Sequence, residues 1–292
     1  MPLDDQGEAL IAELNLHPLN RSRLRELWHL DAPWERAAAL EPLQIWSGRL
    51  VYQQALQQEA RLYGFRRHQC LVDGFRLHWL DNGQLDDQAR AVPGETRPVL
   101  LLLHGLSAEK SHWVRFARYF SRDYRVLMLD LPWHGQTGYQ SGREYSTKVQ
   151  AFRVLDWLDQ LGIKRFAVAG NSMGGFIAAR IATLAPDRVK ALMLVDAAGL
   201  QARTHSHLEE ALRSGRNPFL LHSVAEFDRL MQMAAVHLPW MPGNVRVMLA
   251  RQYFERRERW FDIFCQILRE VDPVAGLEGS VTMIAEPHAA AL

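Results

Sequence analysis

Four short apolar runs, separated by segments of helical character, constrain the fold of this chain more than any other feature. In these runs apolar residues follow one another without the alternation typical of a strand with one wet face. Strands of this kind are buried on both faces, as in a parallel sheet covered by helices. The sequence therefore predicts an α/β fold, with strands at 99–103, 124–129, 165–169 and 189–195 and helices at 113–120, 147–161 and 173–184.

The segments before and after these alternating strands and helices predict a hairpin, a helical cap and a short C-terminal remnant. A hairpin that turns at Asp73-Gly74, with strands at 67–72 and 75–81, opens an α/β core expected over residues 66–199. Beyond it the strand pattern stops, and residues 200–272 predict a helical cap with helices at 205–213, 224–236 and 245–271. Residues 273–292 are expected to form a short remnant of the C-terminal core.

Residues 1–65 predict an N-terminal helical extension, which we interpret as a layer packed on the main domain. Tryptophans at 28, 34 and 46 leave open the alternative of a helix that makes peripheral contact with a membrane or a partner. Apolar residues recur there at helical spacing in two stripes. The stripes are Leu24, Leu27 and Trp28, and Leu43, Trp46 and Leu50, with Ile45, Tyr52 and Leu56 beside the second.

Composition excludes several classes of function. The 292 residues carry 34 Lys and Arg and 33 Asp and Glu, a net charge of +1, so no nucleic-acid partner is expected. Cys70 and Cys265 lack the spacing of a disulfide scaffold or zinc ribbon, and His205 and His207 are interpreted as a solvated helix face, so no metal is expected. The sequence contains no glycine motif of the kind that binds phosphate groups, so no cofactor is expected. The acidic N-terminus and short apolar runs predict a cytoplasmic protein without a transmembrane segment.

The sequence GNSMGG at positions 170–175 is the strongest chemical motif. It joins a predicted strand to a predicted helix, and in that context G-x-S-x-G is typical of a nucleophile elbow, a sharp turn that holds a serine in strained geometry. Glycines are expected two residues before and after the serine because side chains there would collide across the turn. The Ser172 hydroxyl is then expected above the carboxyl edge of the sheet, at the positive end of the following helix.

A second motif, His104-Gly105-Leu106, directly follows the predicted strand at 99–103. Acyl transfer needs preorganised donors for an oxyanion, and these are commonly backbone N–H groups. Gly105 would allow a tight turn that points the N–H of Leu106 at the site, where the N–H of Met173 would be the second donor.

A third motif, DLPWHG at 130–135, is interpreted as structural. Asp130 can bond the amides of its own loop. We do not expect His134 to be the general base, because its loop follows a strand on the far side of the nucleophile's neighbours.

Together the post-strand motifs HGLSAEKSHW, DLPWHGQT, GNSMGG and LVDAAGL resemble the α/β-hydrolase superfamily, more closely its lipases, esterases and monoacylglycerol-lipase-like proteins. The resemblance covers residues 68–280. It implies an α/β-hydrolase fold, a small hydrophobic ester as substrate, Ser172 as nucleophile, and Leu106 and Met173 as the oxyanion hole. A serine at the elbow argues against the epoxide hydrolases and haloalkane dehalogenases of the superfamily, which carry aspartate there.

The acid and histidine of the family have no evident counterpart. In the family they follow later strands, in the order Ser, acid, His, and the 20 residues after 272 are too few, because one βαβ unit needs about 30. We therefore expect a truncated C-terminal part and impaired catalysis. Asp196 is the candidate substitute acid and His288 the candidate substitute base, with Glu286 near where the acid belongs.

Two consequences follow from the same expectation. Without further strands, the strand at 189–195 would be an apolar edge, which predicts dimers or aggregates through pairing with another chain. The alternatives to ester hydrolysis are a non-catalytic protein of the same fold, as a pseudoenzyme or ligand binder, and a C–C bond hydrolase that uses the same elbow.

Overall fold

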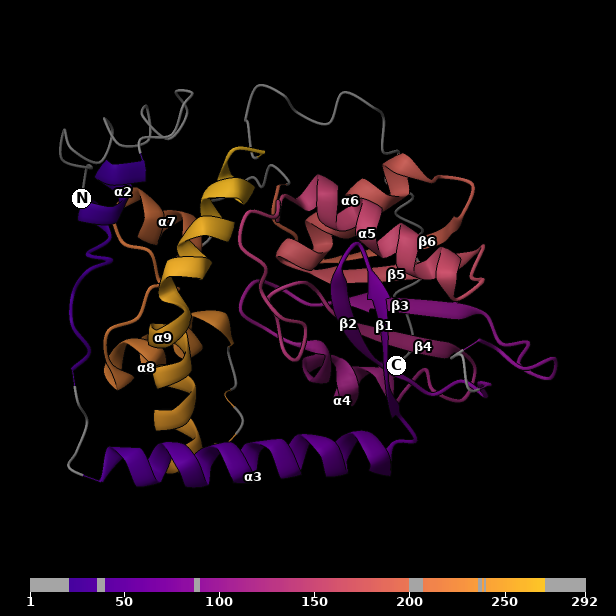
Figure 1. Ribbon diagram of the computed structural model, residues 1–292, viewed down its shortest axis with the longest axis horizontal. Coiled ribbons are helices and arrows are strands. Elements are labelled where there is room, and N and C mark those ends of the chain that lie inside the picture. Colours follow the sequence, from indigo (N-terminus) through magenta and orange to yellow (C-terminus); the bar gives the residue numbers. More distant parts are fainter. Residues whose placement is uncertain are drawn as a thin grey trace, which may run out of the picture.

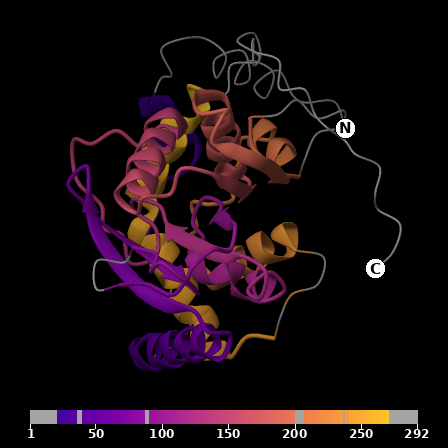
Figure 2. The same cartoon turned by 90° about the vertical axis from the view of Figure 1, so that its right-hand side faces the viewer.

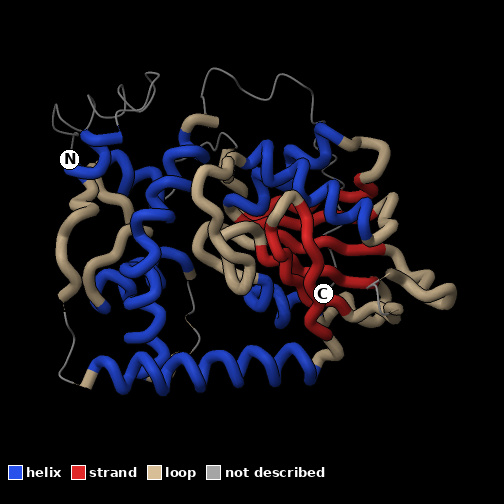
Figure 3. The backbone as a smooth tube through the Cα atoms, in the orientation of Figure 1, coloured by secondary structure: helices blue, strands red, loops and turns tan. Residues whose placement is uncertain are grey.

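A six-stranded sheet with the order β1-β2-β4-β3-β5-β6 forms the centre of the molecule (Figures 1 and 3). The computed structural model describes residues 21–35, 40–86, 90–199, 207–235 and 240–270, and Leu238. β1 and β2 form an antiparallel hairpin, β2 is antiparallel to β4, and β4, β3, β5 and β6 run parallel. The strands are β1 (Arg66–Val72), β2 (Phe75–Asp81), β3 (Val99–Leu103), β4 (Arg125–Asp130), β5 (Phe166–Asn171) and β6 (Val189–Val195).

Helices cover both faces of the sheet, which explains the apolar runs of β3, β4 and β5, whereas β6 is only partly buried. In β3, Leu101 and Leu103 belong to one core cluster, together with residues of α5 (Thr147–Gln160) and α6 (Met173–Leu184). Leu100 and Leu102 belong to a second cluster on the opposite face. That face is covered by η1 (Lys110–Trp113), α4 (Val114–Ala117) and the C-terminal end of α3 (Glu41–Leu62). The predicted α/β fold with a mostly parallel sheet is therefore confirmed.

A helical part lies beside the sheet, on the left in Figure 1. It consists of α2 (Arg21–Leu27), α7 (His207–Arg213), α8 (Val224–Ala234) and α9 (Gly243–Leu268). The ring of Trp28 packs edge-on against Phe261 and Phe264 of α9, at centroid distances of 5.8 and 5.7 Å. Trp28 is thus a core residue and does not contact the surroundings of the protein.

The end of the helical part is tied to the sheet domain through Glu270. Its carboxylate accepts hydrogen bonds from the backbone N–H groups of Thr147, at 2.6 Å, and Lys148, at 3.2 Å. These are first-turn amides of α5, which have no partner within the helix, and a negative charge is favourable at this end of a helix.

The orientation of α3 corrects the interpretation of its apolar stripe. Leu43, Trp46 and Leu50 point to solvent. The helix packs on α9 through its other side, where Gly48 meets Asn244: a Cβ at residue 48 would lie 2.2 Å from the carbonyl oxygen of Asn244. The side of α3 that carries Gly48 therefore faces inward, because only there can its backbone approach that of α9 closely.

Smaller differences concern the ends of elements. The helix predicted at 113–120 is instead the short η1 turn followed by the single turn of α4. β4 and β5 begin and end one or two residues later than predicted, whereas β3, β6 and α6 have the predicted limits. Among the described residues, no helix is both long and apolar enough to cross a membrane.

β6 lies at the edge of the sheet. In the part of the chain that the structure describes, its only strand partner is β5. Met193, in the middle of β6, has about half of its surface exposed.

Candidate active site

Ser172 is the single residue between the end of β5 and the start of α6, and it has φ 51° and ψ −118°. A positive φ is uncommon for a residue with a side chain, and it persists only where the surroundings enforce it. Here backbone hydrogen bonds hold both sides of the residue. The N–H of Ser172 donates to Val195 at 3.0 Å, and its carbonyl accepts from Phe176 at 3.1 Å and Ala198 at 3.0 Å.

Close backbone contacts require the glycines of the motif. A Cβ at Gly170 would lie 2.2 Å from the carbonyl oxygen of Gly174, on the other side of the turn. A Cβ at Gly174 would lie 2.3 Å from the carbonyl oxygen of Leu103 at the end of β3. A side chain at either position would therefore collide with backbone across the turn, as the motif predicts.

The loop after β3 touches the serine. A Cβ at Gly105 would lie 3.2 Å from Cβ of Ser172, which is tighter than most Cβ contacts, so a side chain at residue 105 would require the neighbouring residues to shift. The next residue is Leu106, whose N–H donates no hydrogen bond to another described residue. Met173 is the first residue of α6, so its N–H has no partner within the helix. Two amides without a hydrogen-bond partner among the described residues, those of Leu106 and Met173, thus directly follow Gly105 and Ser172 in the chain.

A buried ion pair holds the loop that follows β3. The ammonium group of Lys110 pairs with the carboxylate of Asp130, and both side chains are buried. The same carboxylate accepts from the backbone N–H groups of Lys110 and Gln136, each at 2.8 Å. Asp130 therefore joins the loops after β3 and β4, as its predicted role in bonding loop amides requires.

A second contact fixes the loop from the helical part. Ser107, which follows Leu106 and has φ 62°, lies with its Oγ 2.7 Å from the phenol oxygen of Tyr253 in α9. Tyr52 of α3 donates to Glu109 in the same loop at 3.0 Å. Sequence motifs did not reveal Tyr253 or Tyr52, because no local pattern connects residues so distant in the chain.

His104 and His134 are buried in a neutral state. Nε2 of His104 accepts from the N–H of Leu131 at 3.1 Å, and its Nδ1 lies 2.8 Å from the carbonyl oxygen of Gly105. Burial lowers the pKa of His104 to about 4. The ring of His134 lies 4.8 Å from that of His104 and 5.0 Å from that of Trp260, and burial lowers its pKa well below its ordinary value. Both rings are therefore packed in the core beside the site.

Asp196, the candidate acid, forms no side-chain hydrogen bond with Ser172 in the described part of the chain. Among the described residues, no side chain forms a hydrogen bond with Ser172 Oγ. Asp196 follows β6 with φ 44° and is exposed. Its neighbours Val195 and Ala198 hydrogen-bond the Ser172 backbone, which places Asp196 at the same edge of the sheet. His288 and Glu286 lie outside the described residues.

The described residues contain no group of three or more His, Cys, Asp or Glu side chains that could hold a metal ion. His207 is exposed at the start of α7, and His205 lies outside the described residues.

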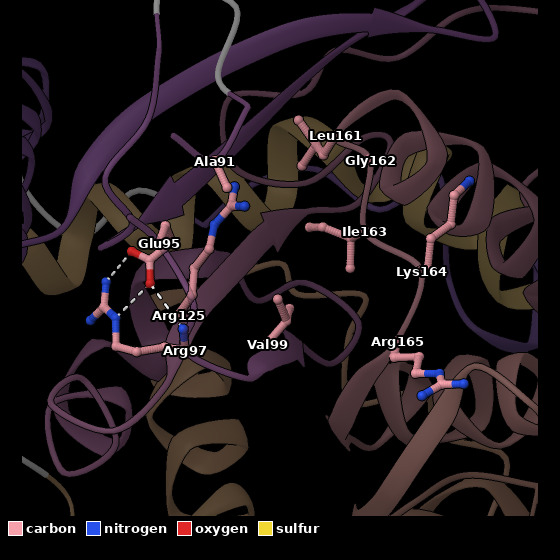
Figure 4. A pocket seen from close by; sticks show the side chains of 10 residues that line it. All are labelled: Ala91, Glu95, Arg97, Val99, Arg125, Leu161, Gly162, Ile163, Lys164 and Arg165. Carbon is pink, nitrogen blue, oxygen red and sulfur yellow. Dashed lines mark hydrogen bonds and ion pairs between the residues drawn. The ribbon is translucent and has the colours of Figure 1, made fainter. Parts of the chain in front are cut away.

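A pocket at the opposite edge of the sheet is separate from this site (Figure 4). It is lined by Val99 at the start of β3 and Arg165 just before β5, whereas Ser172 follows the other end of β5. Glu95 and Arg97 form an ion pair in its wall, with the Arg97 Nε 2.8 Å from a Glu95 oxygen. The guanidinium lowers the pKa of Glu95 to about 2.

Comparison with known proteins agrees with this geometry. The model of the α/β-hydrolase fold family matches residues 98–246. Lipase 1 of Psychrobacter immobilis is 28% identical over 68% of this chain and 60% of its own. Human monoacylglycerol lipase ABHD6 is 32% identical over 62% of this chain and 56% of its own. The chain thus spans less than two thirds of the length of these curated relatives.

A solved structure extends the comparison to three dimensions. The crystal structure of a membrane phospholipase A, a bacterial virulence factor, is 32% identical, with a TM-score of 0.70. The match covers 77% of this chain and 69% of that one.

Proposed function

Because the chain belongs to the α/β-hydrolase family, in its lipase and esterase branch, we propose that it hydrolyses carboxylic esters through an acyl-enzyme on Ser172. One observation carries the proposal. Ser172 has φ 51° at a strand-to-helix turn, with the Gly105–Leu106 loop in contact with it. A strained serine next to unpaired amides is suited to attack a carbonyl group and to stabilise the charge that forms on its oxygen.

The reaction would proceed in two steps. Ser172 Oγ forms a bond to the ester carbonyl carbon while the N–H groups of Leu106 and Met173 donate to the carbonyl oxygen, which carries the negative charge. The C–O bond to the alcohol then breaks, and the alcohol leaves with the proton lost by the serine. Water attacks the acyl-serine in the same geometry, releases the carboxylic acid and restores the hydroxyl group.

Impaired catalysis is part of the proposal. Ser172 is a weak nucleophile unless a base takes its proton, and its hydroxyl has no hydrogen-bonded base among the described residues. In a serine protease the loss of the base costs about 10⁶ in kcat, whereas the oxyanion hole and binding retain roughly 10³–10⁴ over water. A ligand binder without turnover is the second candidate, favoured by this same lack of a bonded base.

Similarity to lipases supports a hydrophobic acyl chain in the substrate. Lipase 1 of Psychrobacter immobilis and human monoacylglycerol lipase ABHD6 are both named as lipases. In the cap, Leu220 and Leu221 are buried in packed clusters, whereas Leu238 and Trp240 are 46% and 88% exposed. Esters with long acyl chains reside in membranes, so peripheral contact with a membrane belongs to the proposal.

The test compares the chain with its Ser172→Ala variant on a short-chain p-nitrophenyl ester. Intact mass spectrometry would follow the acyl group on the protein, and Ser121→Ala, at a half-buried serine whose hydroxyl donates to the Arg118 carbonyl, is the matched control. We expect slow turnover and an acyl adduct that the Ser172→Ala variant lacks and the control keeps. Equal turnover and labelling in the chain and its Ser172→Ala variant would refute the proposal.

Fast ester turnover would refute only the proposal that catalysis is impaired. Turnover at ordinary enzyme rates, about 1–10³ s⁻¹, that depends on Ser172 would mean that an acid and a base act on it. Asp196 and His288 would then be the first residues to replace.

Association through β6 is also part of the proposal. An edge strand presents unpaired N–H and C=O groups that can pair with another chain, and β6 has this position among the described strands. We expect sedimentation velocity to detect concentration-dependent association that Met193→Lys weakens, because like charges on two paired edges repel. A monomer at all concentrations would contradict this part.

A further inference from the structure

We propose that the outer face of α3, formed by Leu43, Trp46, Leu50 and Arg61, docks on the surface of an anionic lipid bilayer. This inference assigns a surface to the membrane contact included in the proposed function and rests on it in that respect, but its test measures vesicle binding, so it can fail while ester hydrolysis by Ser172 holds. α3 lies at the periphery of the molecule in both views (Figures 1 and 2), where such a surface could approach it.

The outer face is apolar where a surface helix is normally polar. Leu43, Trp46 and Leu50 are spaced so that they share one side of the helix, and they are 58%, 66% and 50% exposed. The opposite side carries the buried residues Glu41 and Gly48. The helix therefore has an apolar stripe that no described part of the protein covers.

Contacts on the inner face prevent α3 from rolling to bury this stripe. Gly48 is pressed against Asn244, and the side-chain amide of Asn244 donates to Ser47 Oγ at 3.1 Å. Further along, Tyr52 donates to Glu109 in the loop after β3. The exposed position of the stripe is thus a consequence of specific contacts at two points of the helix.

The charges on α3 favour an anionic partner. Its exposed charged residues are Arg49 and Arg61, and the exposed Arg66 and Arg67 follow at the start of β1. Its two glutamates do not oppose them: Glu41 is buried, and Glu59 accepts from Arg115 at 2.6 Å. Arginines near a membrane surface contribute about 1 kcal/mol each through anionic lipids.

The aromatic residues favour lipid over protein as the partner. Tryptophan prefers the boundary between apolar chains and water. Trp240 is 88% exposed and lies four residues before Asn244, which contacts α3. A standard protein interface buries about 800 Å² per partner, more than three separate side chains supply, whereas a bilayer can accept each apolar side chain individually.

Docking in this manner would place the candidate site next to the lipid. Glu109, the partner of Tyr52, belongs to the same loop as Leu106. The loop and the bilayer would then contact opposite sides of one helix, which is about 10 Å thick with its side chains.

The test is co-sedimentation of the full chain with vesicles of phosphatidylcholine, alone or mixed with phosphatidylglycerol. We expect binding that increases with phosphatidylglycerol and decreases at high salt. The double variant Trp46→Ser, Leu50→Ser should reduce the partition coefficient at least about tenfold, and Arg61→Glu should weaken binding only to the anionic vesicles. Leu71→Ser, at a residue 66% exposed on β1, is the matched control and should bind like the unmodified chain.

Three outcomes would overturn the proposal. The first is vesicle binding that the double variant retains, and the second is equal loss of binding in the Leu71→Ser control. The third is a dimer, detected by sedimentation velocity without vesicles, that Trp46→Ser dissociates while no form of the chain binds lipid. Thermal unfolding by circular dichroism should be unchanged in all variants, because every substituted side chain is exposed.

Discussion

The hydroxyl groups of Ser107 and Tyr253 lie 2.7 Å apart, although the two residues are 146 positions apart in the sequence. Ser107 directly follows Leu106, a candidate oxyanion donor, and Tyr253 lies in the middle of α9. Burial raises the pKa of Tyr253, so its phenol remains protonated at neutral pH and can donate. The loop beside Ser172 is thereby held at Ser107 by the helical part and at Lys110 by Asp130.

Tyr253→Phe should loosen the loop without altering its backbone sequence. The loss of one hydrogen bond should lower the free energy of unfolding by about 1 kcal/mol. Under the proposed function, acylation of Ser172 should slow severalfold with little change in KM, because the loop acts on the oxyanion and not on substrate binding.

A double-mutant cycle with Ser107→Ala separates this contact from general packing effects. Urea unfolding of the two single variants and the double variant should give a coupling free energy of about 0.5–1.5 kcal/mol. Strictly additive effects would mean that the two hydroxyl groups do not stabilise each other.

Asp130→Asn should be among the most destabilising polar substitutions in the described chain. It leaves the buried ammonium of Lys110 without a counter-charge, which typically costs about 3–5 kcal/mol. Asp159→Asn is the matched control, because Asp159 pairs with Lys164 and Arg188 at the surface, where such pairs contribute about 0–1 kcal/mol. Urea unfolding of both variants checks the prediction, and similar losses would contradict it.

The alternation of strands and helices, and the turn at Ser172, could be predicted because each depends on local sequence. Apolar runs specify strands buried on both faces, and the glycines at 170 and 174 specify the sharp turn. The side of α3 that faces inward could not be predicted, since periodicity identifies an apolar stripe but not its partner. A glycine at 48, opposite that stripe, allowed a backbone crossing that apolar burial alone does not indicate.

The contacts that residues from distant elements make with the site also could not be predicted from the sequence. Tyr253 belongs to a long helix with no motif around it, and only the path of the chain brings it to Ser107. Asp130 is the contrasting case. It is the last residue of β4 and precedes a turn-forming loop, so its bonds to loop amides could be expected from its neighbours alone.

Acidification should destabilise the fold through His104. Its pKa is lowered to about 4 in the folded chain, against about 6.5 in an unfolded one, so the unfolded state binds the proton first as the pH falls. The stabilisation is complete above pH 6.5 and is lost progressively between pH 6.5 and 4, by about 3 kcal/mol. His134, whose pKa is also lowered by burial, acts in the same direction.

Urea unfolding between pH 7 and 4 measures this dependence. His104→Gln should flatten the profile in that window, because glutamine can still accept from the Leu131 N–H but does not titrate. His207→Gln, at an exposed histidine, is the control and should leave the profile unchanged. An unaltered slope in the His104→Gln variant would contradict the assignment of the effect to this ring.

Gly174→Ala tests whether the turn itself creates the candidate site. The new methyl group would lie 2.3 Å from the carbonyl oxygen of Leu103 and 2.5 Å from that of His104. Both oxygens belong to backbone that carries the oxyanion loop, so α6 must move away from that loop. We expect a loss of about 1–3 kcal/mol in unfolding free energy, as for other overpacked sites, and loss of Ser172 acylation.

The matched control for this substitution is Gly94→Ala. An added Cβ at Gly94 would have no heavy atom within 4 Å, and its φ lies outside the left-handed region. Its unfolding free energy and its acylation should equal those of the unmodified chain. If Gly174→Ala kept the acylation rate of this control, the separation of Ser172 from the Leu106 amide would not matter to the reaction. The oxyanion role of Leu106 would then be wrong, even with Ser172 as the nucleophile.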